Sequence, residues 1–282
     1  RPKLAIAGNQ VGTRDLALAL MKEGYAFDLI INCGPEKARM ISGYLDLTPF
    51  AQEHDIPLYR PRVYTLKSKT DQEALLKFGV DAIVLNGWQR LLPDWFLASL
   101  RLGAYGMHGS SEPLPKGRGR SPLNWSLIEG KSRFISHLLK LDMGVDSGLV
   151  VDTLTFDISP WDTIESLYYK VEIAQFRLLR KHLPAILSGT VQARPQPKDV
   201  EPTYYPQRRP EDGIIDWNHT TMEVFNLVRA VAKPYPGAFS YLKGQKVMIW
   251  VARPFDTRLT YPEATTGQIV ESFSTGKLVV AT

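Results

Sequence analysis

The stretch Lys3-Leu4-Ala5-Ile6-Ala7-Gly8 decides the fold, because its apolar run ends at a glycine in the way typical of a buried parallel strand. A helical pattern follows from Asp15 to Glu23 and is closed by Gly24. A second apolar strand is then predicted from Ala26 to Ile31. A strand, a helix and a strand in this order predict the beginning of a parallel α/β sheet.

The same alternation continues along the chain. Further strands are predicted at Ile56–Tyr59, Asp81–Asn86, Gly103–His108, Phe134–Leu141 and Leu149–Phe156, and helices at Leu47–His54, Thr70–Phe78, Leu92–Leu100, Ser121–Ile128 and Thr163–Leu187. We therefore expect a Rossmann-like parallel-sheet domain over residues 1–190. Ligands of such sheets bind outside the carboxyl ends of the strands, where Asn86, His108 and Asp146 would all lie.

The remainder of the chain has a different character. Residues 191–210 are rich in proline and lack apolar periodicity, so we expect a linker there. Beyond it, a helix over Thr221–Ala232 and alternating strands such as Lys246–Val251 predict a small β-rich domain over residues 211–282, resembling an OB-type barrel. The last segment, Gly276–Thr282, is predicted to be a strand without a closing turn, so we expect this domain to continue beyond it.

Composition excludes several classes of protein. The chain has 282 residues, is 44% hydrophobic and carries a net charge of +5, which describes a globular protein with a mild basic excess. Its one cysteine, Cys33, has no partner for a disulfide, and no apolar run is long enough to cross a bilayer. We therefore expect a cytoplasmic protein without membrane contact. The scattered histidines predict no metal site, and Gly8–Gly12 lacks the glycine spacing of a dinucleotide site.

The residues from 104 to 148 predict an enzyme. His108 ends an apolar run and Asp146 lies among small residues, and a histidine with a carboxylate supplies the proton transfer that acyl transfer requires. Without the flanking motifs, a lone His108 at a strand end would more often be a satisfied polar residue, whereas the motifs around it favour catalysis. Between the two, Lys116, Arg118 and Arg120 alternate with glycines before a predicted helix, a pattern that favours binding of an anion such as phosphate, although charge runs are usually solvated.

Several of these motifs, in their order and spacing, are similar to those of one enzyme family. The chain resembles the formyltransferases that use 10-formyltetrahydrofolate, namely the methionyl-tRNA formyltransferases and the N-formyltransferases of nucleotide-linked amino sugars. The resemblance covers nearly the whole chain. It rests on Gly87–Pro93, His108, Pro115–Pro122, Trp125, Leu141–Gly148, Asp212–Trp217, Arg229–Ala230 and Pro236–Ala238.

The resemblance implies a role for each motif. His108 matches the family's catalytic histidine and Asp146 its catalytic aspartate. Folate would be held by the loop that follows the strand ending at Asn86, and also by Asp142. The loop residues concerned are Trp88, Gln89, Arg90, Leu91 and Leu92. The acceptor would contact Ser110 together with Lys116, Arg118 and Arg120.

One position departs from the family pattern. The family has Asn-X-His at the end of this strand, whereas the triplet here is Gly106-Met107-His108. A charged His108, a backbone N–H of the neighbouring loop or Asn86 could support the oxyanion in place of the missing amide, in that order of preference. Because losing such a donor costs about 2 to 4 kcal/mol, a non-catalytic folate-binding module stays as an alternative.

Charge favours one acceptor class over the other. From Tyr205 onward the chain carries nine Lys and Arg against seven Asp and Glu, a net charge of +2. A tRNA-binding domain should carry a pronounced basic face. We therefore expect a nucleotide-linked amino sugar as acceptor, with methionyl-tRNA as the alternative. The sequence does not identify the sugar. It is also compatible with a homo-oligomer.

Overall fold

The computed structural model describes residues 1–282, which form two compact units. The first unit comprises Arg1–Gly119, Ile135–Phe156 and Lys170–Tyr204, and the second comprises Arg120–Phe134, Asp157–Tyr169 and Tyr205–Thr282. The chain therefore passes repeatedly from one unit to the other, and neither unit is one continuous stretch of sequence.

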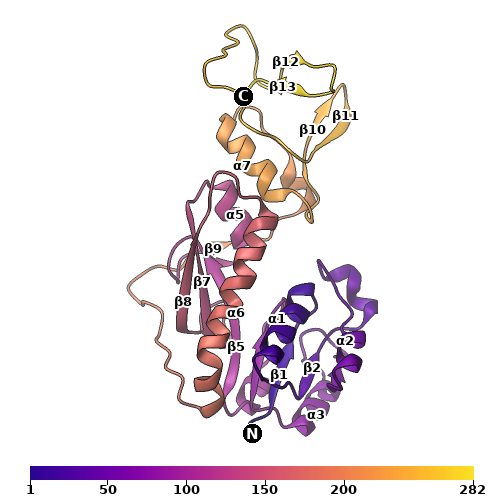
Figure 1. Ribbon diagram of the computed structural model, residues 1–282, viewed down its shortest axis with the longest axis vertical. Helices are drawn as coiled ribbons and strands as arrows, with labels where there is room; N and C mark the ends of the chain where they lie inside the picture. Colours follow the sequence, from indigo (N-terminus) through magenta and orange to yellow (C-terminus); the bar gives the residue numbers. More distant parts are fainter. The chain divides into compact units, whose positions relative to one another are not determined.

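A seven-stranded sheet forms the centre of the first unit, in the order β3-β2-β1-β4-β5-β7-β8 (Figure 1). Its strands are β1 (Leu4–Ala7), β2 (Leu29–Ile31), β3 (Leu58–Tyr59), β4 (Ala82–Leu85), β5 (Gly103–Ser110), β7 (Arg133–Lys140) and β8 (Leu149–Asp157). The strands from β3 to β5 pair in parallel, whereas β7 pairs antiparallel with β5. The strand order reverses between β1 and β4, which places the expected ligand crevice at the carboxyl ends of these strands.

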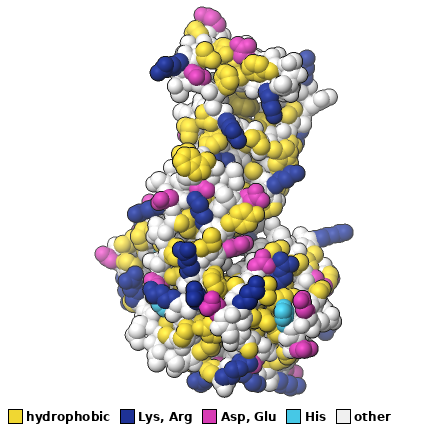
Figure 2. All heavy atoms as spheres, viewed as in Figure 1, with side chains coloured by type: hydrophobic (Ala, Val, Ile, Leu, Met, Phe, Trp, Pro, Cys, Tyr) yellow, Lys and Arg dark blue, Asp and Glu magenta, His cyan; other side chains and the backbone are white.

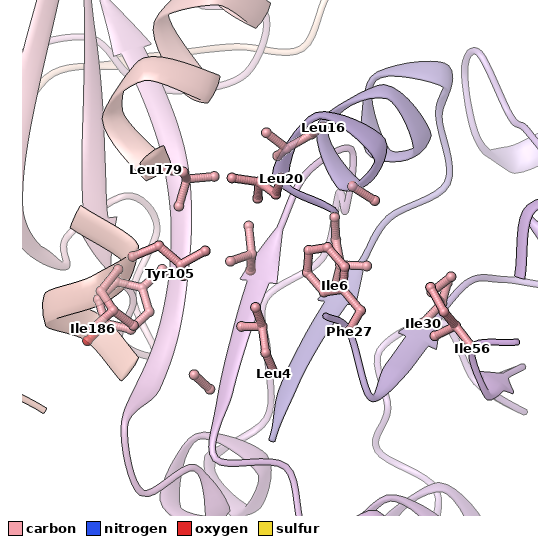
Figure 3. Close-up of a cluster of buried hydrophobic side chains, with 14 of the residues drawn as sticks. Leu4, Ile6, Leu16, Leu20, Phe27, Ile30, Ile56, Tyr105, Leu179 and Ile186 are labelled. Atoms are coloured by element: carbon pink, nitrogen blue, oxygen red, sulfur yellow. The ribbon is translucent and has the colours of Figure 1, made fainter. Parts of the chain in front are cut away.

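Helices cover both faces of this sheet. On one face, Leu16 and Leu20 of α1 (Val11–Lys22) and Leu179 of α6 (Ile164–Ser188) join one apolar cluster with strand residues such as Ile6 (Figure 3). On the other face, α3 (Lys69–Phe78) and α4 (Asp94–Ser99) contribute to a second cluster around Ile83. Alternate residues of one strand enter opposite clusters, and burial of each large aliphatic side chain stabilises the fold by about 1.5 to 3 kcal/mol.

The predicted parallel α/β architecture is confirmed, and the strands and helices expected for residues 1–190 are present. Some ends differ. Helix α1 begins at Val11 rather than at Asp15, because Oγ1 of Thr13 accepts the Gln10 N–H and starts the helix within a glycine-containing segment. Two short elements complete this region, α2 (Thr48–Glu53) and the 3-10 helix η1 (Pro35–Met40).

The proline-rich segment 191–210, expected to be a linker, is largely part of the first unit. Arg194 forms a β-bridge with Val150, and β9 (Tyr204–Tyr205) pairs with β6 (Arg118–Gly119). Prolines prevent a helix or a central strand but allow an extended edge segment. The segment therefore lies along the sheet rather than spanning open space.

The second unit is built around two helices, α5 (Pro122–Ile128) and α7 (Thr221–Val231). The Asn124 amide donates to the Ala230 carbonyl, and the guanidinium of Arg229 donates to the carbonyls of Ser159, Pro160 and Asp162. These bonds explain why residues 120–134 and 157–169 join the C-terminal part. The division differs from the sequence expectation, in which the first domain runs without interruption to residue 190.

The strands of the second unit form hairpins rather than the expected barrel. β10 (Ala238–Leu242) pairs antiparallel with β11 (Gln245–Ile249), and β12 (Ile269–Ser272) pairs antiparallel with β13 (Leu278–Val280), as separate two-stranded sheets. The 3-10 helix η2 (Pro210–Gly213) precedes α7. The unit is β-rich, as expected, without a closed sheet. None of the protein's helices combines the length and the apolar character that crossing a bilayer demands.

Candidate active site

His108 lies near the carboxyl end of β5, beyond the last residue that pairs with β4. Side chains alternate along a strand, so His108 shares a face with Ala104 and Gly106, on the side of the α3 and α4 cluster. The ring is 8% exposed. A titratable ring thus lies at the edge of the sheet where proteins of this architecture bind their ligands.

An aspartate contacts this histidine. Nδ1 of His108 lies 3.3 Å from Oδ1 of Asp146, which comes from the turn between β7 and β8. The other carboxylate oxygen of Asp146 accepts the Gly119 N–H at 2.9 Å. Gly148 permits this turn, because a Cβ atom there would lie 2.3 Å from the Lys140 carbonyl oxygen. The structure therefore brings together the imidazole and the carboxylate that the sequence singles out.

The second ring nitrogen also faces an acceptor. Nε2 of His108 lies 2.8 Å from the carbonyl oxygen of Gly117. A carbonyl oxygen only accepts, so Nε2 is the donor in its contact with Gly117. His108 can act as a base at Nε2 only after this nitrogen has given up its proton and the Gly117 carbonyl has moved away.

Asn86, a candidate oxyanion donor, is not placed beside His108. Its amide nitrogen donates to Oε1 of Gln175 at 2.8 Å, and its carbonyl accepts the hydroxyl of Thr13. Because side chains alternate along a strand, Asn86 lies on the same face of the sheet as Val84, which belongs to the cluster with α1 and α6. The register of β4 and β5 places His108 on the opposite face. The structure gives no support to Asn86 as the replacement for the missing amide.

The position of the absent family asparagine is occupied by an aliphatic side chain. A Cβ atom built at Gly106 would lie 3.2 Å from Cδ1 of Leu141 and 3.6 Å from Cβ of Leu85. Of these two neighbours, only the Leu141 contact is made by the movable end of a side chain. The site beside His108 is therefore apolar at this point.

Comparison with known proteins decides the family. A family model described as "Formyl transferase" matches residues 32–183, and one described as "Formyl transferase, C-terminal domain" matches residues 208–282. The chain belongs to the formyl transferase family. The resemblance drawn from its motifs is thereby confirmed.

A sequence relative of this formyl transferase agrees with the family assignment. The chain is 35% identical over 201 residues to the bifunctional polymyxin resistance protein ArnA of Wigglesworthia glossinidia brevipalpis. The match covers 71% of this chain but only 30% of that protein, so the chain spans about a third of the length of this relative.

Two solved structures share the fold. One is an N-formyltransferase from Helicobacter canadensis in complex with folinic acid and dTDP-3-aminofucose, with 19% identity over 88% of this chain and 86% of that one and a TM-score of 0.62. The other is HypX from Aquifex aeolicus in complex with tetrahydrofolic acid, with 18% identity over 99% of this chain and 42% of that one and a TM-score of 0.69.

The loop after β4 in this formyl transferase contacts Tyr64 through a hydrogen bond and two ring contacts. The Tyr64 hydroxyl accepts the Gln89 N–H at 2.9 Å, and its ring contacts both Trp88 and the guanidinium of Arg90. Nε1 of Trp88 is buried without a hydrogen-bond partner. Buried donors are nearly always paired, so this indole nitrogen is an exception within the loop.

The apolar members of this loop point in different directions. Leu91 is 49% exposed, whereas Leu92 is buried in the cluster below the loop. Asp142 lies in the exposed turn after β7, where its Oδ1 accepts the Gly144 N–H and the Ser147 hydroxyl. Leu91 is thus available for a ligand, while Leu92 and Asp142 have structural contacts.

The expected acceptor residues do not form a free basic loop. The guanidinium of Arg118 is buried and bonds to Gln196 and Tyr204. Ser110 is also buried, and its hydroxyl accepts the Glu112 N–H. Lys116 is half-buried in the first unit, and Arg120 is exposed in the second. Arg118 is therefore committed to the protein itself, while a phosphate-binding role for Lys116 and Arg120 stays a prediction.

Sequence reasoning missed the residues that support the site. Tyr64 lies in an irregular segment, and Gln196 and Thr203 lie in the proline-rich stretch predicted to be a linker. The Thr203 hydroxyl accepts the Gly117 N–H at 2.8 Å, so this stretch contacts the loop over His108. No local motif marks these residues, because their partners are 25 to 86 positions away in the chain. No group of three or more His, Cys, Asp or Glu side chains is placed to hold a metal ion.

Proposed function

We propose that this formyl transferase moves the formyl group of 10-formyltetrahydrofolate to the primary amine of an amino sugar linked to a nucleotide. The observation that carries the proposal is the 3.3 Å contact between Nδ1 of His108 and Oδ1 of Asp146 at the carboxyl end of the sheet. The N-formyltransferase from Helicobacter canadensis is in complex with folinic acid and dTDP-3-aminofucose, which supports the choice of both substrate classes for this chain.

In this reaction His108 and Asp146 would handle the proton transfer. 10-Formyltetrahydrofolate, when bound, supplies the formyl group. Asp146 holds Nδ1 of His108 and stabilises the imidazolium, so that Nε2 is the nitrogen that exchanges protons with the acceptor amine. The largely buried setting excludes most water and strengthens this charge interaction. The Gly117 carbonyl has to leave Nε2 before the amine approaches.

Folate would be held by the loop over Tyr64. The exposed side chain of Leu91 offers an apolar surface for a flat ring. Gln89 contributes through its backbone, which Tyr64 orients, and Arg90 packs over the Tyr64 ring. These contacts support the loop as a binding element.

The distribution of charge supports a small acceptor over a tRNA. In the second unit Lys233 lies over the ring of Trp250, Lys246 over the ring of Phe239, and Arg229 is buried. On the face drawn in Figure 2, Lys and Arg side chains are interspersed with Asp and Glu rather than gathered in one stripe. A tRNA site would need free cations aligned with phosphates.

A non-catalytic folate-binding module is the second candidate, because Gly106 replaces the family asparagine and the Gly117 carbonyl caps Nε2. Incubation with 10-formyltetrahydrofolate and either a panel of amino-sugar nucleotides or aminoacylated initiator tRNA separates the three possibilities. We expect formylation of a sugar nucleotide. Formylation of tRNA alone would overturn the acceptor, and folate binding without turnover would favour the binding module.

The histidine itself is tested by substitution. We expect His108→Ala to lower kcat by about 100-fold to 10,000-fold, because it removes the proton relay. The matched control is His219→Ala, which removes an exposed histidine of the second unit. Undiminished activity of His108→Ala would remove the mechanism while leaving the family assignment intact.

A further inference from the structure

A buried glutamine lies under the Asp146 turn. Gln196 is 8% exposed, although it sits between Pro195 and Pro197 in a segment that leads toward the second unit. The two family matches end at residue 183 and resume at residue 208, so neither includes it. Its position therefore has to be explained from the contacts of this chain.

Gln196 uses its full hydrogen-bonding capacity. Its amide nitrogen donates to the carbonyl of Asp146 at 2.7 Å and to the carbonyl of Gly148 at 3.0 Å. Its amide oxygen accepts from two nitrogens of Arg118, Nη2 at 2.6 Å and Nε at 3.2 Å. Two donors and two lone pairs are all that a glutamine side chain has. The orientation of the amide is thereby set, because the exchanged orientation would bring donor against donor and acceptor against acceptor.

The turn needs such support at Asp146. The backbone of this residue has φ +51°, in the left-handed region that residues other than glycine rarely adopt. The backbone carbonyl of Asp146 is held by Gln196, and the carboxylate of Asp146 is held by the Gly119 N–H. Together these bonds fix both ends of the residue, and the direction of its carboxylate toward His108 follows from them.

Arg118 connects the two supports. Its side chain bonds to Gln196, its Nη1 donates to the Tyr204 hydroxyl at 3.0 Å, and the next residue, Gly119, supplies the N–H on the carboxylate. A buried guanidinium with polar partners resists displacement, since leaving it unpaired is costly. Gln196 thus belongs to a closed network that joins the proline-rich segment, the loop after β5 and the Asp146 turn.

We propose that Gln196 is a positioning residue for proton transfer, which acts by holding the Asp146 turn so that its carboxylate stays against Nδ1 of His108. The inference rests on the proposed function of His108 and Asp146. It adds that a side chain outside both family-matched regions sets the geometry of this pair.

Three variants test the proposal. Gln196→Ala removes every contact of the amide, whereas Gln196→Glu keeps acceptors for Arg118 but loses the donors to Asp146 and Gly148. We expect both to lower kcat by about 10-fold to 100-fold with a smaller change in KM, since displacing a catalytic group by about 1 Å has effects of that size. Gln192→Ala, an exposed glutamine of the same segment, is the matched control and should match the wild type.

A double-mutant comparison separates positioning from general stability. If Gln196 acts through the carboxylate, Gln196→Ala should cause no further loss of kcat in an Asp146→Asn background. Equal losses in both backgrounds would overturn the proposal, as would a Gln196→Glu variant with wild-type kcat. Thermal unfolding of each variant identifies a protein that has lost its fold, and Gln196→Glu then serves as the milder probe.

One measurement does not depend on activity. The Gly119 N–H, which bonds to the Asp146 carboxylate, should exchange with deuterium faster in Gln196→Glu than in wild type or Gln192→Ala. Unchanged exchange would contradict the proposal even in an active enzyme. If the wild type shows no formyl transfer, the proposed function fails, while faster exchange in the variant would still establish the hold of Gln196 on the turn.

Discussion

Nδ1 of His137 lies 3.2 Å from the carbonyl oxygen of His108, the residue directly opposite it in the β5 and β7 pair. Nε2 of His137 accepts the Leu114 N–H at 3.3 Å, so the ring carries its proton on Nδ1 and is neutral. Burial is the main reason that the pKa of His137 falls to about 4. A second histidine thus supports the backbone of the first without taking part in proton exchange at neutral pH.

This histidine makes stability depend on pH. Between pH 6.5 and about 4 the unfolded chain binds a proton at His137 that the folded chain does not, so the free energy of unfolding falls as the pH falls through this window. We expect a loss of about 3 kcal/mol from this residue, complete near pH 4. Urea unfolding across this range should show a flatter pH dependence for His137→Gln. Parallel curves for the variant and the wild type would contradict the assignment.

The Gly117 carbonyl controls access to His108. Gly117 has φ +74°, which an alanine adopts only with strain. We expect Gly117→Ala to weaken the contact with Nε2 and so to raise kcat/KM, because the ring is then open to the acceptor amine. Gly24→Ala is the control, because Gly24 has φ +91° with no atom within 4 Å of a Cβ. Equal kcat/KM for all three proteins would show that the carbonyl does not compete for the ring.

Tyr64 should affect folate binding rather than the chemical step. Tyr64→Phe leaves the Gln89 N–H and the Asn9 amide without their acceptor, and buried donors left unpaired cost about 1 to 3 kcal/mol each. We expect KM for 10-formyltetrahydrofolate to rise by about 10-fold with a smaller change in kcat. Tyr241→Phe, at an exposed position, is the control. A KM equal to that of the wild type would exclude a role for this loop.

Gly106 should accept the family asparagine. The nearest obstacle to a side chain there is the end of Leu141, which can rotate, and Gly106 does not have a positive φ. We expect Gly106→Asn to fold and to raise kcat, by up to about 100-fold if the amide reaches the developing oxyanion. Gly106→Ala separates the amide from mere crowding of Leu141. Equal rates for the two variants would indicate that the oxyanion is stabilised elsewhere.

The parallel sheet and its helices are predictable because local patterns encode them. The apolar run at Leu4–Ala7 and the periodic segment that forms α3 place their side chains by a period of two or 3.6 residues, which neighbouring residues suffice to show. His108 and Asp146 are also predictable, as members of the motifs quoted for the family. Their contact does not follow from the meeting of parallel strand ends, because Asp146 follows β7, which runs antiparallel to β5.

Other parts of the site could not be predicted. The face of the sheet on which Asn86 lies depends on how its strand is aligned with the neighbouring strands. A shift of that alignment by one residue would place Asn86 on the opposite face. The second unit is expected from its sequence to close into a barrel, yet its hairpins stay separate, since the pairing of distant strands is not a local property. Arg118 resembles a free cation in the sequence because sequence shows charge but not partners.

The sequence by itself determined the order of strands and helices, the family and the identity of the imidazole and carboxylate pair, because each is written in residues close together in the chain. Only the tertiary structure decided that a proline-rich stretch supports the Asp146 turn, that Gly117 caps His108 and that Leu141 occupies the space beside Gly106. These contacts join residues separated along the chain, or depend on the path of a loop, and hydrogen bonds or packing at that range are fixed only once the whole fold has formed.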